Sequence, residues 1–470
     1  MFDEEELLNL YSGRGSKPHD PRPLLKFVIY QHALGKTEPT HWADELVSDR
    51  NAQWLVFGMR VSRTAMYNFR DRIEPIIAKI NAQVVRFSVE QGLINPNRAS
   101  LDGTYIAANT SRCKLLNLPK IEKRLLWIKQ EIASFEPSSS LHWTFSTLDE
   151  ELRPAWLART LVGLRLQLRM HLKARTELQE LLAANANRRR DKRKPENKIV
   201  VSVADSDAVY GRDKDKVYRP LYNVQTVCDL ESEMVLSYEV FSQVSDSGTL
   251  QPLVGKLENN GVLLKSLLAD SGYPTGEDLA FCEDQGVNLY APWQENSFTD
   301  KKRSSQDGNE MFNQSDFQWD PDRNSYLCPN GETLSFSEKK SRQRADGSVV
   351  RFELYRAPAE ACQTCPLATS IRCTTSANGR SLRRDPNQDL IDDLRERMGT
   401  PEAKLLYALR GQTIERIFAD FKEHRGARRF RGRGIGRARV QYGLTVLGHN
   451  IRIALRLLKI KNAERENQNN

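Results

Sequence analysis

The stretch SLLADSGYPT, residues 266–275, ends an apolar run on Asp270 and continues at once with Ser, Gly, Tyr and Pro. These residue types stop strands and cap helices, so one interpretation of Asp270 is a turn residue. The other interpretation is a metal ligand, because ligands in mixed α/β sheets lie at the carboxyl ends of strands. This stretch alone leaves both open, and the turn is the commoner case.

Two further acidic residues stand out. Asp102 lies near the start of a short strand-like pattern in RASLDGTYIAANTS, residues 98–111. Glu415 lies in a late helical segment beside the apolar stripe of Ile417 and Phe418, which places its carboxylate at the rim of a packed face. Lys422 follows seven residues later on nearly the same line of the helix. An ordinary surface pair of Glu415 and Lys422 accounts for that spacing equally well.

Alternation of helical and strand-like patterns defines the elements that must position these residues. The first 96 residues are helical throughout and fit either a helix-turn-helix DNA reader or a plain bundle. Long charged helices recur after residue 113, and strand-like runs followed by a strand–helix–strand pattern predict an α/β sheet with mixed pairing. The predicted units are 1–96 helical, for DNA binding or dimerisation; 97–112 first strand; 113–197 helical insertion; 198–295 sheet continued; 296–386 cysteine-containing insertion; 387–460 late helices and basic region; and 461–470 disordered tail.

Three blocks carry a resemblance to a known family: LDGTYIAANTS, LLADSGYPTGEDLAFCEDQGVNLYAP and YALRGQTIERIFADFKEHRGARRFRGRG. In this order they resemble signature blocks of the DDE transposases encoded by bacterial insertion sequences, and YNVQTVCD and GHNIRIAL resemble flanking blocks. The resemblance runs from about residue 98 to 457. It implies an RNase H-like core in which Asp102, Asp270 and Glu415 hold two Mg²⁺ or Mn²⁺ ions.

The resemblance also implies an activity. Two divalent ions would assist hydrolysis at the ends of a mobile element and then attack of the freed 3′-hydroxyl on target DNA. The late helix is similar to the family's Tyr-Arg-Glu-Lys signature at Tyr407, Arg410, Glu415 and Lys422, although four residues separate Arg410 from Glu415 where three are commoner. Arg410 and Lys422 would then contact phosphates beside the scissile bond. A nuclease of the same fold that cleaves without joining, and an inactive DNA-binding copy, are the alternatives.

A basic balance favours a polyanionic partner. The formal charge is +9 and the pI is about 9.1. Residues 422–439 hold eight Lys or Arg against one Glu, interleaved with Gly and Phe, as in surfaces that follow a nucleic-acid backbone. We expect double-stranded DNA as partner, namely the terminal inverted repeats and the target, bound by a homodimer. The predicted DNA contacts are Tyr407, Arg410, Lys422, Arg425, Arg428, Arg429, Arg431 and Arg433.

Four of the seven cysteines fall within the second insertion, as Cys328, Cys362, Cys365 and Cys373. One tight Cys-x2-Cys pair with two looser partners suits a tetrahedral Zn²⁺ site, but a strong zinc ribbon would show two such pairs. A structural zinc ion is therefore one of two readings of this cluster, and incidental thiols are the other.

Other classes of protein are disfavoured. No run approaches the roughly 18 apolar residues that span a bilayer, and the first residues lack the order of a signal peptide, so we expect a cytoplasmic bacterial protein with no membrane. No GKS- or GKT-type loop appears, so no nucleotide cofactor is implied. Asp205, Asp207, Asp229 and Asp246 are expected to be supporting or turn residues rather than ligands.

Overall fold

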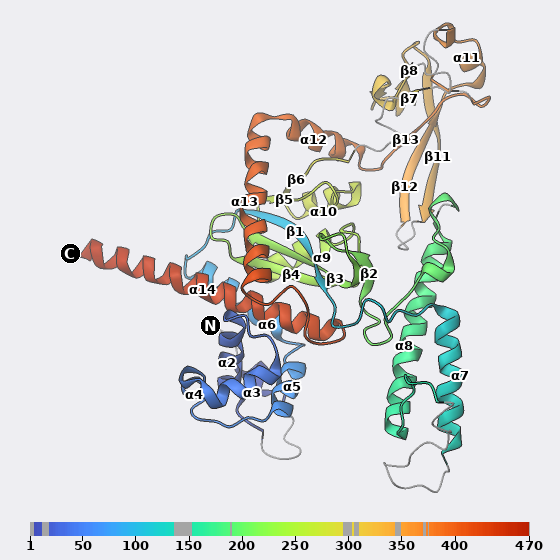
Figure 1. Ribbon diagram of the computed structural model, residues 1–470. Coiled ribbons are helices and arrows are strands. Elements are labelled where there is room, and N and C mark those ends of the chain that lie inside the picture. The colour runs from blue at the N-terminus through green and yellow to red at the C-terminus, as the bar shows by residue number, and fades with distance from the viewer. Residues whose placement is uncertain are drawn as a thin grey trace.

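A mixed six-stranded sheet forms the centre of the computed structural model, which describes residues 4–11, 18–135, 153–188, 190–294, 303–304, 310–343, 349–369, 373–374 and 376–469 (Figure 1). Its strands are β1 (Arg98–Ala107), β2 (Val209–Arg212), β3 (Tyr218–Asp229), β4 (Val235–Phe241), β5 (Ser266–Leu268) and β6 (Asn288–Tyr290). The order is β2-β3-β1-β5-β6, and β4 also pairs with β3. β1, β5 and β6 run parallel, while β3 is antiparallel to β1. The α/β class with mixed pairing is confirmed.

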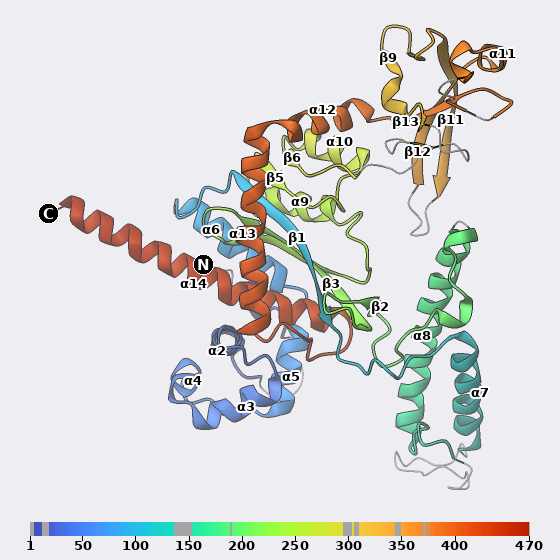
Figure 2. The same ribbon diagram turned by 45° about the horizontal axis from the view of Figure 1, so that its top comes forward.

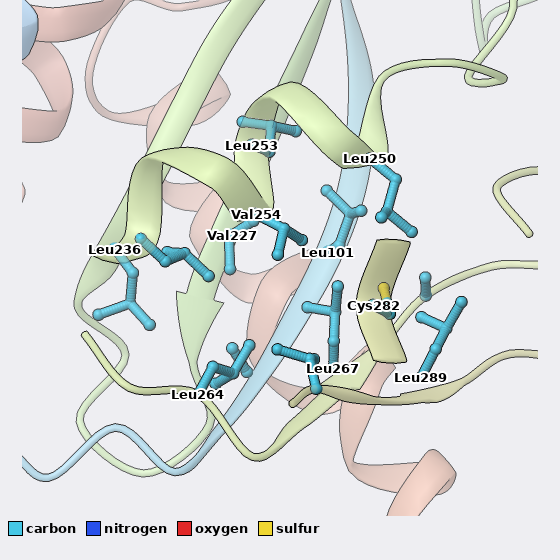
Figure 3. Packing of buried hydrophobic residues seen from close by; sticks show 14 of the residues in the cluster. Leu101, Val227, Leu236, Leu250, Leu253, Val254, Leu264, Leu267, Cys282 and Leu289 are labelled. Atoms are coloured by element: carbon cyan, nitrogen blue, oxygen red, sulfur yellow. The ribbon is translucent and has the colours of Figure 1, made fainter. Parts of the chain in front are cut away.

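Helices cover both faces of this sheet. On one face, α9 (Leu250–Asn259) and α10 (Gly276–Asp284) bury Leu101, Leu253 and Leu267 in a common cluster, which Figure 3 shows from close by. On the other face, α13 (Pro401–Glu423) packs Ile414 and Phe421 against β1, β3 and β4. Strand β3 is therefore buried along nearly its whole length, as expected for a strand with both faces covered.

The long helix α14 (Ile435–Asn469) joins the sheet to the N-terminal helices. These are α1 (Glu4–Leu8), α2 (Pro21–Ala33), α3 (Pro39–Ser48), α4 (Arg50–Leu55), α5 (Arg63–Arg72) and α6 (Ile77–Glu90). Val440, Leu444 and Leu447 of α14 enter the core of this helical unit, whereas Tyr442 and Val446 enter the core beneath the sheet. The far end of α14 projects away from the rest of the molecule in both views (Figures 1 and 2).

Two appendages lie on the side opposite to that projecting end (Figure 2). One is a helical hairpin of α7 (Leu118–Ser134) and α8 (Leu161–Ala186). The other is a five-stranded antiparallel sheet of β9 (Gln318–Asp320), β10 (Ser325–Leu327), β11 (Thr333–Gln343), β12 (Val349–Arg356) and β13 (Ser381–Arg384), with the short helix α11 (Ala359–Gln363); β7 (Arg303–Ser304) and β8 (Glu310–Met311) form a separate pair. Helix α12 (Gln388–Gly399) leads from this sheet to α13.

No helix in the described part of the chain is long and apolar enough to cross a membrane.

The structure differs from the sequence-based expectation at two places. The strand-like run 198–210 becomes a strand only at Val209, where β2 begins. Before it the chain forms turns and one isolated bridge between Val201 and Leu116, and Asp205 there accepts a hydrogen bond from the hydroxyl of Tyr222 on β3. The tail 461–470 was expected to be disordered, yet α14 continues to Asn469. Its Ala, Glu, Lys and Arg are good helix formers and no Gly or Pro interrupts them.

Candidate active site

Strands β1 and β5 bring two of the predicted acidic residues together. Ser100 of β1 pairs with Leu268 of β5 in parallel register, so two further residues along each chain reach Asp102 and Asp270. Asp270 lies just past the carboxyl end of β5, and its Oδ1 accepts the N–H of Ser271 at 2.6 Å. The side chain of Asp102 is 16% exposed and that of Asp270 is 54% exposed, so one carboxylate is buried and the other faces solvent.

A guanidinium group lies against both carboxylates. Arg410 on α13 places one nitrogen 3.3 Å from Oδ2 of Asp102 and another 3.9 Å from Oδ2 of Asp270. Burial raises the pKa of Asp102, and the charge of Arg410 offsets part of that effect. Burial disfavours the charge on Arg410 as well, yet Asp102, Tyr407 and Asp270 outweigh it and raise the pKa of this side chain. Each aspartate therefore stabilises the positive charge of Arg410, and Arg410 stabilises the negative charge of Asp102.

A buried polar network supports the two aspartates from the opposite face of the sheet. Gly103 faces Gln225 across the β1–β3 pair, and the amide of Gln225 fills the space that a side chain at Gly103 would need. That amide donates to Asn223 at 2.8 Å and to Asp246 at 2.7 Å, and it accepts a hydrogen bond from the hydroxyl of Tyr273. Tyr273 follows Asp270 by three residues, so the network ties the Asp270 loop to β3, the strand that pairs with the strand of Asp102.

Helix α13 carries the four residues of the predicted Tyr-Arg-Glu-Lys set. Thr400 caps its first turn and Pro401 occupies the first helical position, which fixes where the helix starts. The guanidinium carbon of Arg410 lies 5.8 Å from the ring centroid of Tyr407. Burial, followed by the neighbouring charge of Lys214, lowers the pKa of Lys422. Lys214 lies in the turn between β2 and β3, and its charge also acts on Asp102, whereas the charges that act on Lys422 come from this turn and from Arg428.

Glu415 does not join the two aspartates in this conformation. Its side chain is exposed and folds back along α13, with Oε1 3.5 Å from the position that a Cβ on Gly411 would take. Among the described residues, no group of three or more His, Cys, Asp or Glu side chains is arranged to hold a metal ion. The structure therefore brings Asp102, Asp270, Arg410 and Tyr407 together and leaves Glu415 apart.

Each arginine of the predicted basic surface has a partner within the chain. Two of them donate to carbonyls in the loop after β1: Arg429 to Thr110 at 3.0 Å and Arg433 to Asn109 at 3.3 Å. Two others contact the N-terminal helical unit: Arg431 pairs with Glu38 at 3.0 Å, and Arg425 donates to the carbonyl of Ala33. Arg425 also pairs with Asp420 of α13 at 3.2 Å. Arg428 pairs with Glu423 and stays 61% exposed. The segment also pairs with β1 through Phe430 and Ala107. These arginines therefore anchor the segment as well as adding positive charge to its surface.

Sequence reasoning missed several supporting residues. Gln225 and Asn223 belong to the block YNVQTVCD, which was recognised without a role for its members. Asp205 and Asp207 were expected to be supporting residues, and they accept the backbone N–H groups of Gly434 and Ile435 at 3.0 and 3.1 Å, where α14 begins. These acceptors complement the positive end of the helix dipole. Lys214 carried no signal in the sequence, because only the folded turn brings it near Asp102.

The four cysteines of the second insertion surround one small cavity. Cys328, Cys362, Cys365 and Cys373 all line a space of about 30 Å³ and are free thiols. The backbone N–H of Glu332 donates to Sγ of Cys328 at 3.3 Å, and that of Arg380 donates to Sγ of Cys362 at 3.4 Å. Burial raises the pKa of the Cys373 thiol. The charge of Arg380 opposes this rise, and the other three cysteines add to it. The thiols converge, but they are not spaced as metal ligands.

Comparison with known families identifies one part of the chain. Residues 327–454 match the family model described as Transposase DDE domain. The match extends from β10 into α14 and includes Arg410, Glu415 and Lys422, but it covers neither Asp102 nor Asp270. No curated protein matches the chain.

Proposed function

Residues 327–454 are similar to a transposase DDE domain, and on that premise we propose that the chain cleaves DNA at the ends of a mobile element and joins the freed 3′-hydroxyl to target DNA. The observation that carries the proposal is the convergence of Asp102 and Asp270 on one cationic group of α13, a helix within the matched region. Two carboxylates that share a cation at the carboxyl end of a parallel strand suit metal-dependent phosphoryl transfer.

We propose that the central sheet is an RNase H-like core. Three parallel strands with one antiparallel neighbour, in the order β4-β3-β1-β5-β6, support this assignment. The α7–α8 hairpin and the β9–β13 sheet are then insertions into that core, and the N-terminal helices form a DNA-binding or dimerisation unit. The boundaries we propose are those given by the sequence, except that α14 replaces the disordered tail.

Divalent ions, Mg²⁺ or Mn²⁺, fit the donor chemistry of the aspartate pair. Carboxylate oxygens are the ligands that these ions prefer, and the contacts of Arg410 with both side chains, at 3.3 and 3.9 Å, support a site for positive charge at this pair. Glu415 is the proposed third ligand; it lies about 1.4 turns from Arg410 on α13, and its exposed side chain can change rotamer without disturbing the core. When bound, two such ions would activate the attacking oxygen and stabilise the leaving oxygen.

The remaining residues of the site have proposed roles in holding DNA. Lys214 adds positive charge near Asp102, and Tyr407 lies beside Arg410, so a phosphate at this edge would meet donors from two elements. The charge of Lys422 lies near that of Lys214. The exposed arginines at 428, 429, 431 and 433 extend this positive surface toward the N-terminal helices. Such contacts position the backbone and read no sequence. We propose that the element ends and the target are double-stranded DNA and that a homodimer holds the two ends.

We also propose that Cys328, Cys362, Cys365 and Cys373 bind one structural Zn²⁺ ion. Four thiols around a cavity that fits a single ion, and backbone N–H groups directed at two of the sulfurs, support this. Zinc would fasten β10, α11 and the segment before β13 to one another. Small sheets of this size often need such a link.

The decisive test uses purified protein, Mg²⁺ or Mn²⁺, and labelled DNA carrying the sequences that flank its gene, beside an Asp270→Asn variant. Metal-dependent cleavage followed by joining to a plasmid is expected, and the variant should be slower by roughly 100-fold or more, since several kcal/mol of charge stabilisation are lost. Cleavage without joining would identify a nuclease. Binding with no cleavage by either protein would identify an inactive DNA-binding protein.

A further inference from the structure

Arg410 lies where a divalent ion would have to bind. Its guanidinium contacts Oδ2 of Asp102 and Oδ2 of Asp270, and its own side chain is only 14% exposed. A Mg²⁺ ion held by this pair would need carboxylate oxygens at about 2.0–2.1 Å, and the same two Oδ2 atoms are the ones that the positively charged guanidinium contacts. Arg410 and a divalent ion would therefore compete for the aspartate pair.

The arginine also compensates the charges of the pair when no ion is present. Asp102 is buried and Asp270 lies close enough to repel it, and Arg410 is the strongest of the charges that oppose these two effects on Asp102. An arginine is always protonated, so this compensation persists at any physiological pH. The other cation that acts on Asp102 is Lys214, which has no ion pair with it among the described residues.

We propose that Arg410 closes the aspartate pair in the free protein and that a DNA phosphate must draw this side chain away before a divalent ion can bind. This inference rests on the proposed function and specifies its regulation. A phosphate is the natural competitor, because the guanidinium fork binds phosphate in the same bidentate manner as carboxylate. Tyr407, on the same helix, lies beside Arg410, with the guanidinium carbon 5.8 Å from its ring centroid.

The consequence is a reciprocal link between DNA and metal. DNA that removes Arg410 raises the affinity for the ion, and by linkage the ion raises the affinity for DNA by the same factor. A typical coupling of this kind is about 5-fold to 150-fold. The free protein is thereby kept from loading metal and hydrolysing DNA that is not correctly bound.

The test measures Mn²⁺ binding by electron paramagnetic resonance, with the full-length protein alone and with a duplex. Three proteins are compared: wild type, Arg410→Gln and Arg416→Gln. Arg416 is the matched control, since it lies on the same helix and pairs with an acid, Glu233, but contacts neither aspartate. Thermal melting checks that each variant is folded, and Asp270→Asn checks that the Mn²⁺ measured is bound at the pair.

Arg410→Gln is expected to bind Mn²⁺ at least 5-fold more tightly than wild type without DNA, and Arg416→Gln to match wild type. DNA should tighten Mn²⁺ binding to wild type and Arg416→Gln but not to Arg410→Gln. The inference is overturned if Arg410→Gln binds Mn²⁺ no more tightly than wild type, if DNA tightens binding to it as strongly as to wild type, or if Asp270→Asn leaves binding unchanged. Coupling in a protein that never cleaves DNA would instead refute the proposed activity alone.

Discussion

Replacing Gly103 by alanine should disrupt the polar network behind the aspartates. A Cβ at this position would lie 2.3 Å from Nε2 of Gln225 and 2.9 Å from its Cδ, so the amide must move by about 1 Å to reach ordinary contact. The amide makes three hydrogen bonds, to Asn223, Asp246 and Tyr273, and each is worth about 1 kcal/mol net. Losing two of them, with some overpacking, predicts a cost of about 2–3 kcal/mol.

The cost should appear as a lower melting temperature of the unit that contains the sheet, by roughly 4–12 °C. Cleavage should slow as well, because the Asp270 loop loses its tie to β3 through Tyr273 and Gln225. Both effects can be measured on the same preparation by differential scanning fluorimetry and by the DNA cleavage assay.

The double-mutant cycle with Gln225→Ala isolates the cause. Removing the amide makes room for the alanine, so Gly103→Ala should cost less than about 0.5 kcal/mol in the Gln225→Ala background. An equal cost in both backgrounds would refute the reasoning, since the effect would then come from the strand and not from the contact.

Three further predictions follow from other parts of the molecule. Lys422→Gln should reduce the steepness of the plot of log DNA affinity against log salt concentration by about 0.9, because one phosphate contact is lost. The control Lys459→Gln, on the projecting end of α14, should leave that slope unchanged. Equal slopes for wild type and Lys422→Gln would mean that Lys422 does not contact DNA. Purified protein should contain one Zn²⁺ per chain, and Cys362→Ala should lose it and melt earlier while Cys113→Ala keeps it; metal-free wild type would end the zinc proposal. Burial lowers the pKa of His32 to about 4. Between pH 6.5 and 4 the unfolded chain therefore binds a proton that the folded chain does not. The free energy of unfolding should fall by about 3 kcal/mol as the pH drops through this window. The melting temperature of a His32→Gln variant should depend less on pH over that range. An unchanged pH dependence would contradict the lowered pKa of His32.

The sequence predicted the class of the sheet, because strand and helix patterns are local, whereas only the family resemblance implied that Asp102 and Asp270 share a site. Asp270 follows an apolar run and Asp102 lies in a strand, and parallel strands bring such positions to one edge. The position of Glu415 could not be predicted in the same way. Helical periodicity places it on the rim of α13 but does not fix the rotamer of an exposed side chain.

Contacts between distant segments were beyond prediction. The role of Gln225 depends on the register that sets it opposite Gly103, and a shift of one residue would have turned it to the other face. The charge of the run 422–439 and its interleaved Gly and Phe predict a DNA surface, but Arg429 and Arg433 bond to carbonyls in the loop after β1, more than 300 residues earlier in the chain. Composition shows which groups are charged and not which partners the fold supplies.

The cores of this protein cannot be completed until helix α14, near the end of the chain, has been synthesised. Its residues enter the N-terminal core and the cores on both faces of the sheet, through Leu444, Ile453 and Tyr442. α6 ends at Glu90 and α14 begins at Ile435, so at about 5–20 residues per second the ribosome needs on the order of 20–70 s between them. During that interval the N-terminal helices lack the contacts that Val440, Leu444 and Leu447 of α14 make with their apolar core. A nascent or truncated chain would therefore be prone to degradation before it could act on DNA, and only the finished protein would be competent.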